Sequence, residues 1–545
     1  MNVIRTEVAI VGGGPVGMAM AIELGRRGIA CTVVADGDGS VTHGRGGHVN
    51  ERTIELCRRW GIQEAVTRSG FAEDVPMGTI LCTSLRGYEV ARAGDFSPAG
   101  DRQPTAFSPG YEVRCPQSLL EPILQRRVAD FPSVSVLWRH RCESVVQDDT
   151  QVEILAVPDD ADPAGTTKVV ASYLVACDGQ SSPIREALRI TRSGDPLINY
   201  SVSSVVSAPG LADLITIDPA LRYTFIAPDG CWGNITSYGD RQRWRLTVLL
   251  DKTRPDLSDF DPGQYFRRAA GTDEVEFSVE TIRPWRRSEL IADTFHDGRV
   301  FLAGDAAHTM SPTGGYGLNT GFSDVDNLGW KIDAALRGWA GPLLLGSYTA
   351  ERRGAAARNA EFANRHFRGW MYGVQCGPVN EDSDEGVRAR AWTGQNWLDG
   401  IEGEYNAIGG ALGYCYDPSP VCLDDGTPRP KDEPGTYQPT SRPGARAPHA
   451  WDGDGRSMLD LFGTDFTVMH VPAARQRAES IVAAAARQRV PVQRYEIADD
   501  EVARLYQRDL VLVRPDGYVA WRSDLPADTA DDAVRIARGH RALPT

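Results

Sequence analysis

The sequence lacks three features that would define whole classes of protein. Its ten cysteines include no C-x-x-C pair, which indicates neither a metal site nor a disulfide framework and suits a reducing cytoplasm. No apolar run approaches the roughly 18 residues of a membrane-spanning helix. The formal net charge of −15 disfavours nucleic acid as a partner. We therefore expect a cytoplasmic protein with no metal, no membrane anchor and no nucleic-acid partner.

The sequence does contain a glycine-rich motif between an apolar run, Val8 to Val11, and a stretch of helical periodicity. This order predicts a strand, a tight turn and a helix. Gly12 permits the turn, Gly14 lets the backbone approach a pyrophosphate, and Gly17 allows close packing of helix on strand. A second β-branched run leads to Asp36, which follows Gly17 by 19 residues and is placed to accept hydrogen bonds from a ribose. The pattern predicts a dinucleotide-binding site.

Two further motifs indicate which dinucleotide is bound. Asp178 and Asp305 each follow an apolar strand pattern and adjoin a glycine, which places a carboxylate at the carboxyl end of a strand. The ribityl hydroxyls of a flavin need such acceptors. After Asp305 a glycine-rich run, Pro312 to Thr320, opens a long helical pattern. Amides at Gly317, Leu318 and Asn319 would then face the negative charge of a reduced flavin. FAD is therefore the predicted cofactor.

These motifs together resemble those of the group A flavin-dependent aromatic monooxygenases, which have the para-hydroxybenzoate hydroxylase fold. The resemblance covers nearly the whole chain. It implies that Arg45 contacts FAD, that Gln117 reaches the ribityl chain, and that Asp178 with Ser182 and Arg185 serves both FAD and the reduced nicotinamide. One departure is that Asp36 stands where the family commonly has Glu followed by a basic residue.

The positions of the motifs predict an α/β chain with three parts. Residues 1–75, 105–190 and 285–375 are expected to form a Rossmann-like FAD-binding domain. Residues 76–104 and 191–284, rich in β-branched and aromatic side chains, are expected to form an inserted antiparallel-sheet substrate domain. We expect a linker with connecting helices over 376–440. By resemblance to the phenol hydroxylase branch, 441–545 would be a thioredoxin-like domain without its redox cysteine pair.

The chemistry of a flavin oxygenase suggests further roles. The flavin C4a-hydroperoxide must be kept dry, and a phenolic substrate is more reactive once deprotonated. His48 is the candidate base, and Pro312 is expected to shape the oxygen side. Aromatic residues of the substrate sheet are candidate substrate contacts: Tyr223, Trp232 and Tyr238.

The sequence thus predicts an FAD-dependent monooxygenase that uses NADPH or NADH and O2 to hydroxylate a phenol or aromatic polyketide. A Baeyer–Villiger oxygenase of the same fold is one alternative. A non-catalytic FAD-binding protein is another, since fold alone does not establish activity. A flavin halogenase is disfavoured because the chain has no Trp-x-Trp pair. Whether the chain forms a homo-oligomer stays open.

Overall fold

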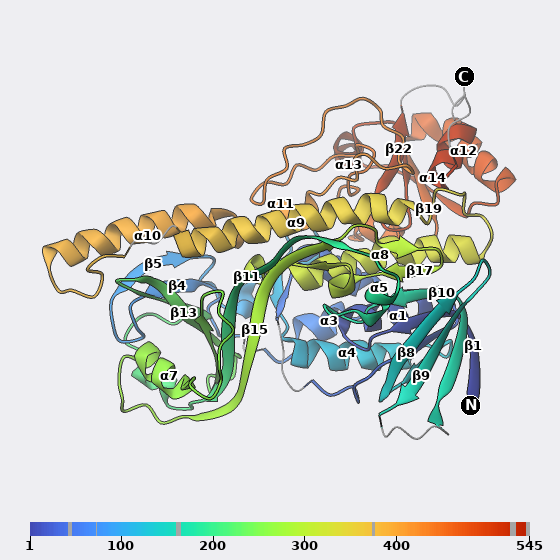
Figure 1. The fold of residues 1–545 in the computed structure, drawn as a ribbon. Coiled ribbons are helices and arrows are strands. Elements are labelled where there is room, and N and C mark those ends of the chain that lie inside the picture. The colour runs from blue at the N-terminus through green and yellow to red at the C-terminus, as the bar shows by residue number, and fades with distance from the viewer. Residues whose placement is uncertain (42–45, 72, 160–164, 373–375, 524–529, 541–545) are drawn as a thin grey trace.

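The computed structural model of the protein describes residues 1–41, 46–71, 73–159, 165–372, 376–523 and 530–540. Three sheets organise the described residues, and long helices connect them (Figure 1). The first and second sheets lie side by side, and the third lies above the first at the end of the chain in the same view.

The first sheet is built on four parallel pairings. Its order is β16 (His296–Asp297), β17 (Val300–Leu302), β10 (Thr167–Ala176), β1 (Asn2–Val11), β2 (Cys31–Val34) and β7 (Val134–Leu137). Strands β17, β10, β1, β2 and β7 run parallel, whereas β16 pairs antiparallel with β17. An antiparallel extension, β9 (Val152–Pro158) and β8 (His140–Gln147), branches from β10. The parallel order sets the carboxyl ends of the central strands at one edge.

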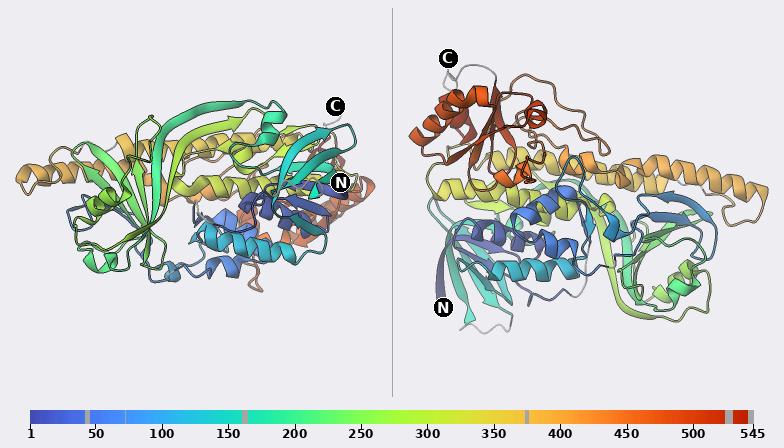
Figure 2. Two further views of the ribbon diagram at one scale, coloured as in Figure 1. Left: turned by 60° about the horizontal axis from the view of Figure 1, so that its bottom comes forward. Right: turned by 180° about the vertical axis from the view of Figure 1, so that it is seen from behind.

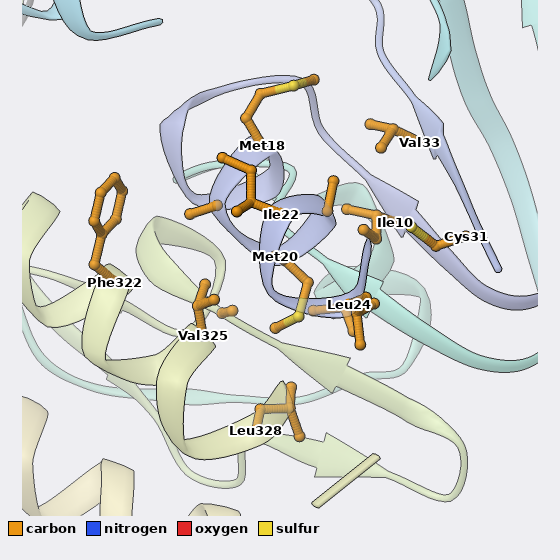
Figure 3. Packing of buried hydrophobic residues seen from close by; sticks show 14 of the residues in the cluster. Ile10, Met18, Met20, Ile22, Leu24, Cys31, Val33, Phe322, Val325 and Leu328 are labelled. Atoms are coloured by element: carbon orange, nitrogen blue, oxygen red, sulfur yellow. The ribbon is translucent and has the colours of Figure 1, made fainter. Parts of the chain in front are cut away.

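Two helices pack against this sheet at the turn after β1. Helix α1 (Pro15–Gly25) begins with Pro at its first position, where a missing N–H costs nothing. Met20, Ile22 and Leu24 of α1 belong to one buried cluster with Phe322, Val325 and Leu328 of α8 (Tyr316–Leu336) (Figure 3). Further helices of this part are α2 (Glu51–Arg59), α3 (Gln63–Thr67), α4 (Gln117–Ala129) and α5 (Pro183–Ala187).

The second sheet is mostly antiparallel, as the sequence predicts. Its order is β18 (His308–Thr309), β15 (Ser278–Ala292), β11 (Arg192–Ser207), β14 (Arg243–Leu249), β13 (Gly230–Ser237), β12 (Arg222–Ala227), β4 (Thr79–Cys82) and β5 (Glu89–Ala93). Only the β12–β4 pairing is parallel among these strands. Helix α7 (Pro262–Ala270) covers one face through Phe266 and Ala269, and the short α6 (Leu211–Leu214) also contributes to that core.

Two long helices run across both sheets (Figure 2). Helix α9 (Ser347–Tyr372) leads into α10 (Asp384–Tyr405), and α10 packs on β5, where Gly394 lies against the carbonyl of Val90. The segment expected as a linker with connecting helices therefore also covers the substrate sheet. Strand β15 crosses the expected boundary at residue 284 because its whole length pairs with β11.

The third sheet lies at the end of the chain. Its order is β20 (Val492–Glu496), β19 (Phe466–His470), β21 (Leu510–Val513) and β22 (Val519–Ser523). Helix α12 (Arg475–Arg487) joins the parallel pair β19–β20, and the hairpin predicted at Asp516-Gly517 joins β21 to β22. This is the expected thioredoxin-like arrangement, completed by α13 (Asp500–Tyr506) and α14 (Ala530–Ala537), whereas α11 (Ile408–Leu412) precedes it and packs against α2.

The thioredoxin-like part is joined to the rest by ion pairs of two kinds. Arg446 donates to Glu55 of α2 (Nε to Oε2, 3.0 Å), and both side chains are buried. Arg58, also of α2, pairs with Asp460 (Nε to Oδ1, 2.7 Å), but both side chains are more than one-third exposed. No helix among the described residues is long and apolar enough to cross a membrane.

Candidate flavin and substrate site

Backbone hydrogen bonds bring the three sequence motifs to one edge of the first sheet. The amide of Gly12 donates to Val34 at the end of β2, and Cys177 after β10 donates to Val11 at the end of β1 (2.7 Å). Ala303 after β17 donates in turn to Ala176 (3.0 Å). The residues that follow β1, β2, β10 and β17 therefore adjoin one another, where open α/β sheets bind ligands.

The glycines of the first motif fit a pyrophosphate. Gly12 has a φ of +112°, and a Cβ there would lie 2.2 Å from the carbonyl oxygen of Cys177. A Cβ on Gly17 would lie 1.9 Å from the carbonyl of Gly12, so helix and strand pack too closely for a side chain. A Cβ on Gly14, by contrast, would meet nothing within 4 Å. Gly14 is also the N-cap of α1 and has no side-chain cap, so the helix offers free amides to an anion.

The predicted carboxylates differ in their surroundings. Asp36 is exposed just beyond β2. Asp178 is turned inward, where it accepts from the Ser182 hydroxyl (2.7 Å) and from the amide of Ile184 (3.1 Å). Burial raises its pKa above the usual value despite these bonds. Arg185 donates to the carbonyl of Ala306 (2.9 Å), which joins the Asp178 loop to the Asp305 loop.

A buried network supports the segment that contains Asp305. The carboxylate of Asp324 in α8 accepts from the amide of Gly304 (3.1 Å) and lies 2.6 Å from Nε2 of His308. Arg352 of α9 donates to its other oxygen (2.8 Å). Burial opposes ionisation of Asp324, but His308 and Arg352 hold its pKa below the ordinary value. His308 therefore helps to hold Asp324 in place beneath the Asp305 segment.

The run from Pro312 to Asn319 forms a tight turn into α8. Gly314 and Gly315 both have positive φ, 75° and 69°, and Gly315 is the N-cap of α8 without a side-chain cap. The first-turn amides, which include Gly317 and Leu318, are thereby left for a negatively charged ligand. The side chain of Asn319 is used differently. It accepts from the amide of Asn50 and donates to the carbonyl of His48, each at 3.1 Å.

One other residue of the predicted cofactor set, Gln117, adjoins the segment that contains His48. Gln117 is the first residue of α4, and its amide donates to the carbonyl of Gly46 (3.0 Å). Arg45 lies outside the described residues. Gln117 at the start of α4 and Asn319 after the glycine-rich turn therefore both bond to the segment from Gly46 to Asn50.

The candidate base His48 adjoins the turn before α8. A Cβ on Gly315 would lie 2.8 Å from Cβ of His48, so the two are in close contact. Nε2 of His48 is 3.6 Å from a carboxylate oxygen of Glu112. Burial, together with Arg114, Arg102 and Arg222, lowers the pKa of His48 to about 4 in spite of Glu112. The imidazole is therefore neutral at physiological pH and available to accept a proton.

Two of the three expected substrate contacts lie on the face of the second sheet that α7 covers. Tyr223 and Trp232 belong to the buried cluster beneath α7. The Tyr223 hydroxyl donates to the carbonyl of Asp218, and Trp232 stacks on Phe225 at 5.1 Å. Helix α7 covers the face to which they point, and their contact with substrate stays a prediction. Only Tyr238 lies on the other face, near Arg245.

The opposite face of the sheet contains residues that the sequence prediction missed. Arg222 of β12 lies 3.9 Å from Glu404 of α10, and Glu404 in turn accepts from the amide of Gly314 (3.3 Å). Tyr405 donates to Thr79 of β4 (2.7 Å). Side chains alternate between the two faces along β12, so the position of Arg222 next to Tyr223 could have suggested that Arg222 points to the opposite face. No signal in the sequence brings α10 to this place.

The geometry defines a protein with a dinucleotide site at the edge of the first sheet and a polar face of the second sheet beside it. A model described as an FAD binding domain matches residues 5–363, and one for the C-terminal part of aromatic-ring hydroxylases matches 440–540. The chain belongs to the FAD-dependent aromatic-ring monooxygenases.

Individual relatives agree with this assignment along the whole chain. The 4-methyl-5-nitrocatechol 5-monooxygenase of a Burkholderia species is 31% identical, with 98% of this chain and 97% of the relative covered. The tetracenomycin A2 monooxygenase-dioxygenase of Streptomyces glaucescens is 30% identical, with 98% and 96% covered. The solved structure of the rebeccamycin biosynthetic enzyme RebC with reduced flavin has a TM-score of 0.91 at 36% identity, with 99% and 100% covered.

The protein is thus an FAD-dependent monooxygenase that takes electrons from NAD(P)H and hydroxylates aromatic substrates. The named monooxygenases among its relatives do not favour the two alternatives, a Baeyer–Villiger oxygenase and a non-catalytic FAD-binding protein.

Proposed function

We propose that the protein hydroxylates a phenol-bearing aromatic compound in a site between the turn at 312–315 and the open face of the second sheet. The observation that supports this site is the contact of two partly buried groups with one turn. His48 packs against Gly315, and Glu404 accepts from the neighbouring amide of Gly314. The substrate would lie beside these groups, opposite the first-turn amides of α8.

The proposed cofactor contacts follow from the fit of the glycine-rich elements. The open space at Gly14 and the uncapped start of α1 would hold the pyrophosphate, and Asp36 the adenosine ribose. Asp305, Gln117 and Arg45 are proposed contacts of the flavin half. The first-turn amides of Gly317 and Leu318 would stabilise negative charge on the flavin ring, while Asn319 holds the turn in place. When bound, the reduced flavin supplies the activated oxygen after reaction with O2.

His48 is proposed as the group that takes the phenolic proton. A neutral imidazole accepts a proton, and its neighbour Glu112 would stabilise the imidazolium that forms. Pro312 would limit access of water on the side of the turn.

The test is NAD(P)H oxidation in air by the purified holoenzyme, with each member of a panel of phenols and aromatic polyketides, followed by product mass. One compound that accelerates oxidation and gains a single oxygen atom supports the proposal. The position of that oxygen separates ring hydroxylation from insertion beside a ketone. If FAD is bound but no compound accelerates oxidation, the proposal of a phenolic substrate fails.

We propose a cytoplasmic location as well. All ten cysteines are free thiols in the structure, a state that a reducing compartment maintains. Fractionation of the source cells with an antibody to the protein tests this location. Sedimentation of the holoenzyme tests whether the chain forms a homo-oligomer.

A further inference from the structure

The hairpin between β21 and β22 has a buried tip, although such turns ordinarily lie on the surface. Residues 514–517, here called the hairpin tip, form a turn in which the amide of Gly517 donates to the carbonyl of Arg514 (2.9 Å). Gly517 has a φ of +79°. Every residue from 511 to 520 is buried, and the side chain of Asp516 is only 1% exposed. The tip is therefore inserted into the rest of the molecule.

The hairpin tip binds α8 through buried polar groups. The carboxylate of Asp516 accepts from the indole N–H of Trp330 (3.2 Å). Arg514 donates to Glu351 of α9 (Nη2 to Oε2, 3.0 Å), and the same carboxylate accepts from Nζ of Lys331 in α8 (2.7 Å). Hydrogen bonds to charged groups are strong where both partners are removed from water. The tip is thus firmly attached to this helix.

The hairpin tip is also bonded to α2. The carbonyl of Asp516 accepts from Nη2 of Arg52 (2.8 Å), and the same nitrogen donates to Asp326 of α8 (2.6 Å). Arg59, the last residue of α2, donates to the other oxygen of Asp326 (2.5 Å). Helices α2 and α8 therefore share one carboxylate, and the tip is bonded to both helices beside it.

These two helices begin together at the flavin site. Asn50 is the N-cap of α2, and its amide donates to the side chain of Asn319 in the first turn of α8 (3.1 Å). His48 precedes Asn50 by two residues, and Arg52 follows it by two. The bond from Arg52 to the tip therefore lies within one helical turn of the candidate base.

The hairpin tip supplies a second point of attachment for α8. Trp330 follows Asn319 by 11 residues, which corresponds to about 16 Å along an α-helix. A helix held at one point can tilt, whereas a helix held at two separated points has a fixed direction. The bond between Asn50 and Asn319 fixes one point, and the tip fixes the other.

We propose that Asp516 is a positioning residue of the flavin site. The hairpin tip holds α2 and α8 in one relative orientation and so aligns the first-turn amides of α8 with the segment that contains His48. The thioredoxin-like part has no cysteine at all, so it would serve the flavin through this contact and not through thiol chemistry. The inference goes beyond the proposed function and rests on its assignment of the α8 amides to the flavin ring.

The alignment of α8 matters most for the reduced cofactor. Reduced flavin carries a negative charge, and the positive end of a helix dipole stabilises such a charge only over a short distance. A tilt of α8 should therefore weaken the binding of reduced FAD more than that of oxidised FAD. The midpoint potential of the bound flavin would then fall.

The test follows FAD in the holoenzyme without any substrate. Dilution of the holoenzyme releases FAD, and the rise of flavin fluorescence gives the rate. Reductive titration under nitrogen with a reference dye gives the midpoint potential. Both quantities are independent of oxygenation, so the test does not depend on the substrate class.

Two variants break the contact from its two sides. Asp516→Asn keeps the shape of the side chain but removes its charge, and we expect FAD release to be about tenfold faster, since a lost hydrogen bond to a charged group is of this size. Trp330→Phe removes only the indole donor on α8, and about threefold faster release is expected because a neutral donor contributes less. The midpoint potential should fall in both variants.

Arg522→Met is the matched control. Arg522 is a buried arginine of β22 that donates to Asp425 (2.6 Å) and to Ser441 (3.0 Å), neither of which lies in α2 or α8. Its loss should lower the melting temperature of the protein, as loss of a buried ion pair does, yet leave FAD release and the midpoint potential unchanged.

Two outcomes overturn the proposal. One is wild-type FAD release and potential in both folded tip variants, and the other is an equal effect of Arg522→Met, because the tip would then act only through general stability. If Asp516→Asn does not fold, Trp330→Phe decides the question by the same two measurements. A holoenzyme that retains FAD but oxygenates no compound would overturn the proposed function and leave the result on the tip intact.

Discussion

Asp324 and His308 form a buried contact of 2.6 Å between Oδ2 and Nε2, and the same carboxylate accepts from Gly304 next to Asp305. The other oxygen is bound by Arg352. The start of the third motif is therefore held by side chains from two helices, α8 and α9, rather than by its own strand.

Removing Arg352 should destabilise this network severely. Arg352→Met leaves the Asp324 carboxylate buried without the guanidinium that binds its Oδ1, and we expect a loss of about 3–5 kcal/mol in the free energy of unfolding. Arg353→Met is the control, since Arg353 pairs with Asp293 at 3.8 Å and both are over 40% exposed. That change should cost less than about 1 kcal/mol. Urea denaturation of the FAD-free proteins measures both, and similar losses for the two variants would contradict the expectation.

The two glycines of the first motif should fail in different ways. Gly17→Ala puts a methyl group where the Gly12 carbonyl already stands, so we expect little folded protein. Gly14→Ala enters open space and should fold normally, yet bind FAD at least about tenfold more weakly, because the methyl group occupies the place of the pyrophosphate. Circular dichroism separates folding from affinity, and fluorescence titration gives the FAD dissociation constant. Normal FAD binding by Gly14→Ala would refute this view of the turn.

His48→Asn should lower the rate of hydroxylation by about 10²- to 10⁴-fold, the usual contribution of a positioned base, while FAD remains bound. Since the pKa of His48 is lowered to about 4, the rate of the wild-type enzyme should fall only as the pH drops toward that value. His140→Asn is the control, because His140 lies in β8 and bonds to the carbonyl of Trp138. If the His48→Asn variant hydroxylates at the wild-type rate, His48 is not the base.

The two ion pairs between α2 and the thioredoxin-like part should differ in strength. Arg446→Met leaves Glu55 buried beside Ser108 and Arg52, and we expect a loss of about 3–5 kcal/mol. Arg58→Met removes only an exposed pair and should cost less than about 1 kcal/mol. Thermal denaturation of both variants and of the wild type measures the two losses. Equal melting temperatures for the two variants would show that burial does not determine how much each ion pair contributes to stability.

Acid should destabilise the protein in a window set by buried histidines. Burial lowers the pKa of His48, His366 and His449 to about 4, below the value of about 6.5 for an exposed histidine. Between those values the unfolded chain binds more protons than the folded one, so stability falls as the pH decreases from about 6.5 to 4. Urea titrations at pH 7, 6 and 5 measure the slope. His449→Gln should flatten it, and an unchanged slope would contradict the assignment.

The strand–turn–helix elements around the predicted flavin site could be predicted from the sequence, because each depends on residues that are neighbours in the chain. Gly12, Gly17 and the carboxylates after the strands are fixed by the turn, the helix and the strand end to which they belong. The parallel order then brings these ends together without any further information. The same reasoning located the hairpin at Asp516-Gly517.

The substrate side could not be predicted in the same way. Alternation shows that Tyr223 and Arg222 point to opposite faces, but it does not say which face another helix will cover. Helix α7 covers the face that contains Tyr223. Helix α10, which lies far along the chain from β12, brings Glu404 to Arg222 on the other face. Contacts between elements so distant leave no periodic signal.

Strands β11 and β15 pair from Arg192 with Ala292 to Ser207 with Ser278, and the end of β15 pairs with His308 and Thr309, just before the turn at 312. They form a continuous two-stranded ribbon that reaches from the substrate face to the flavin turn. Its register shifts between Asp195 and Asn199 and again between Val205 and Val206, the places where such a ribbon bends most easily. The substrate sheet and the segment that leads to the glycine turn are therefore parts of one hydrogen-bonded ribbon, and not two bodies joined by loops alone.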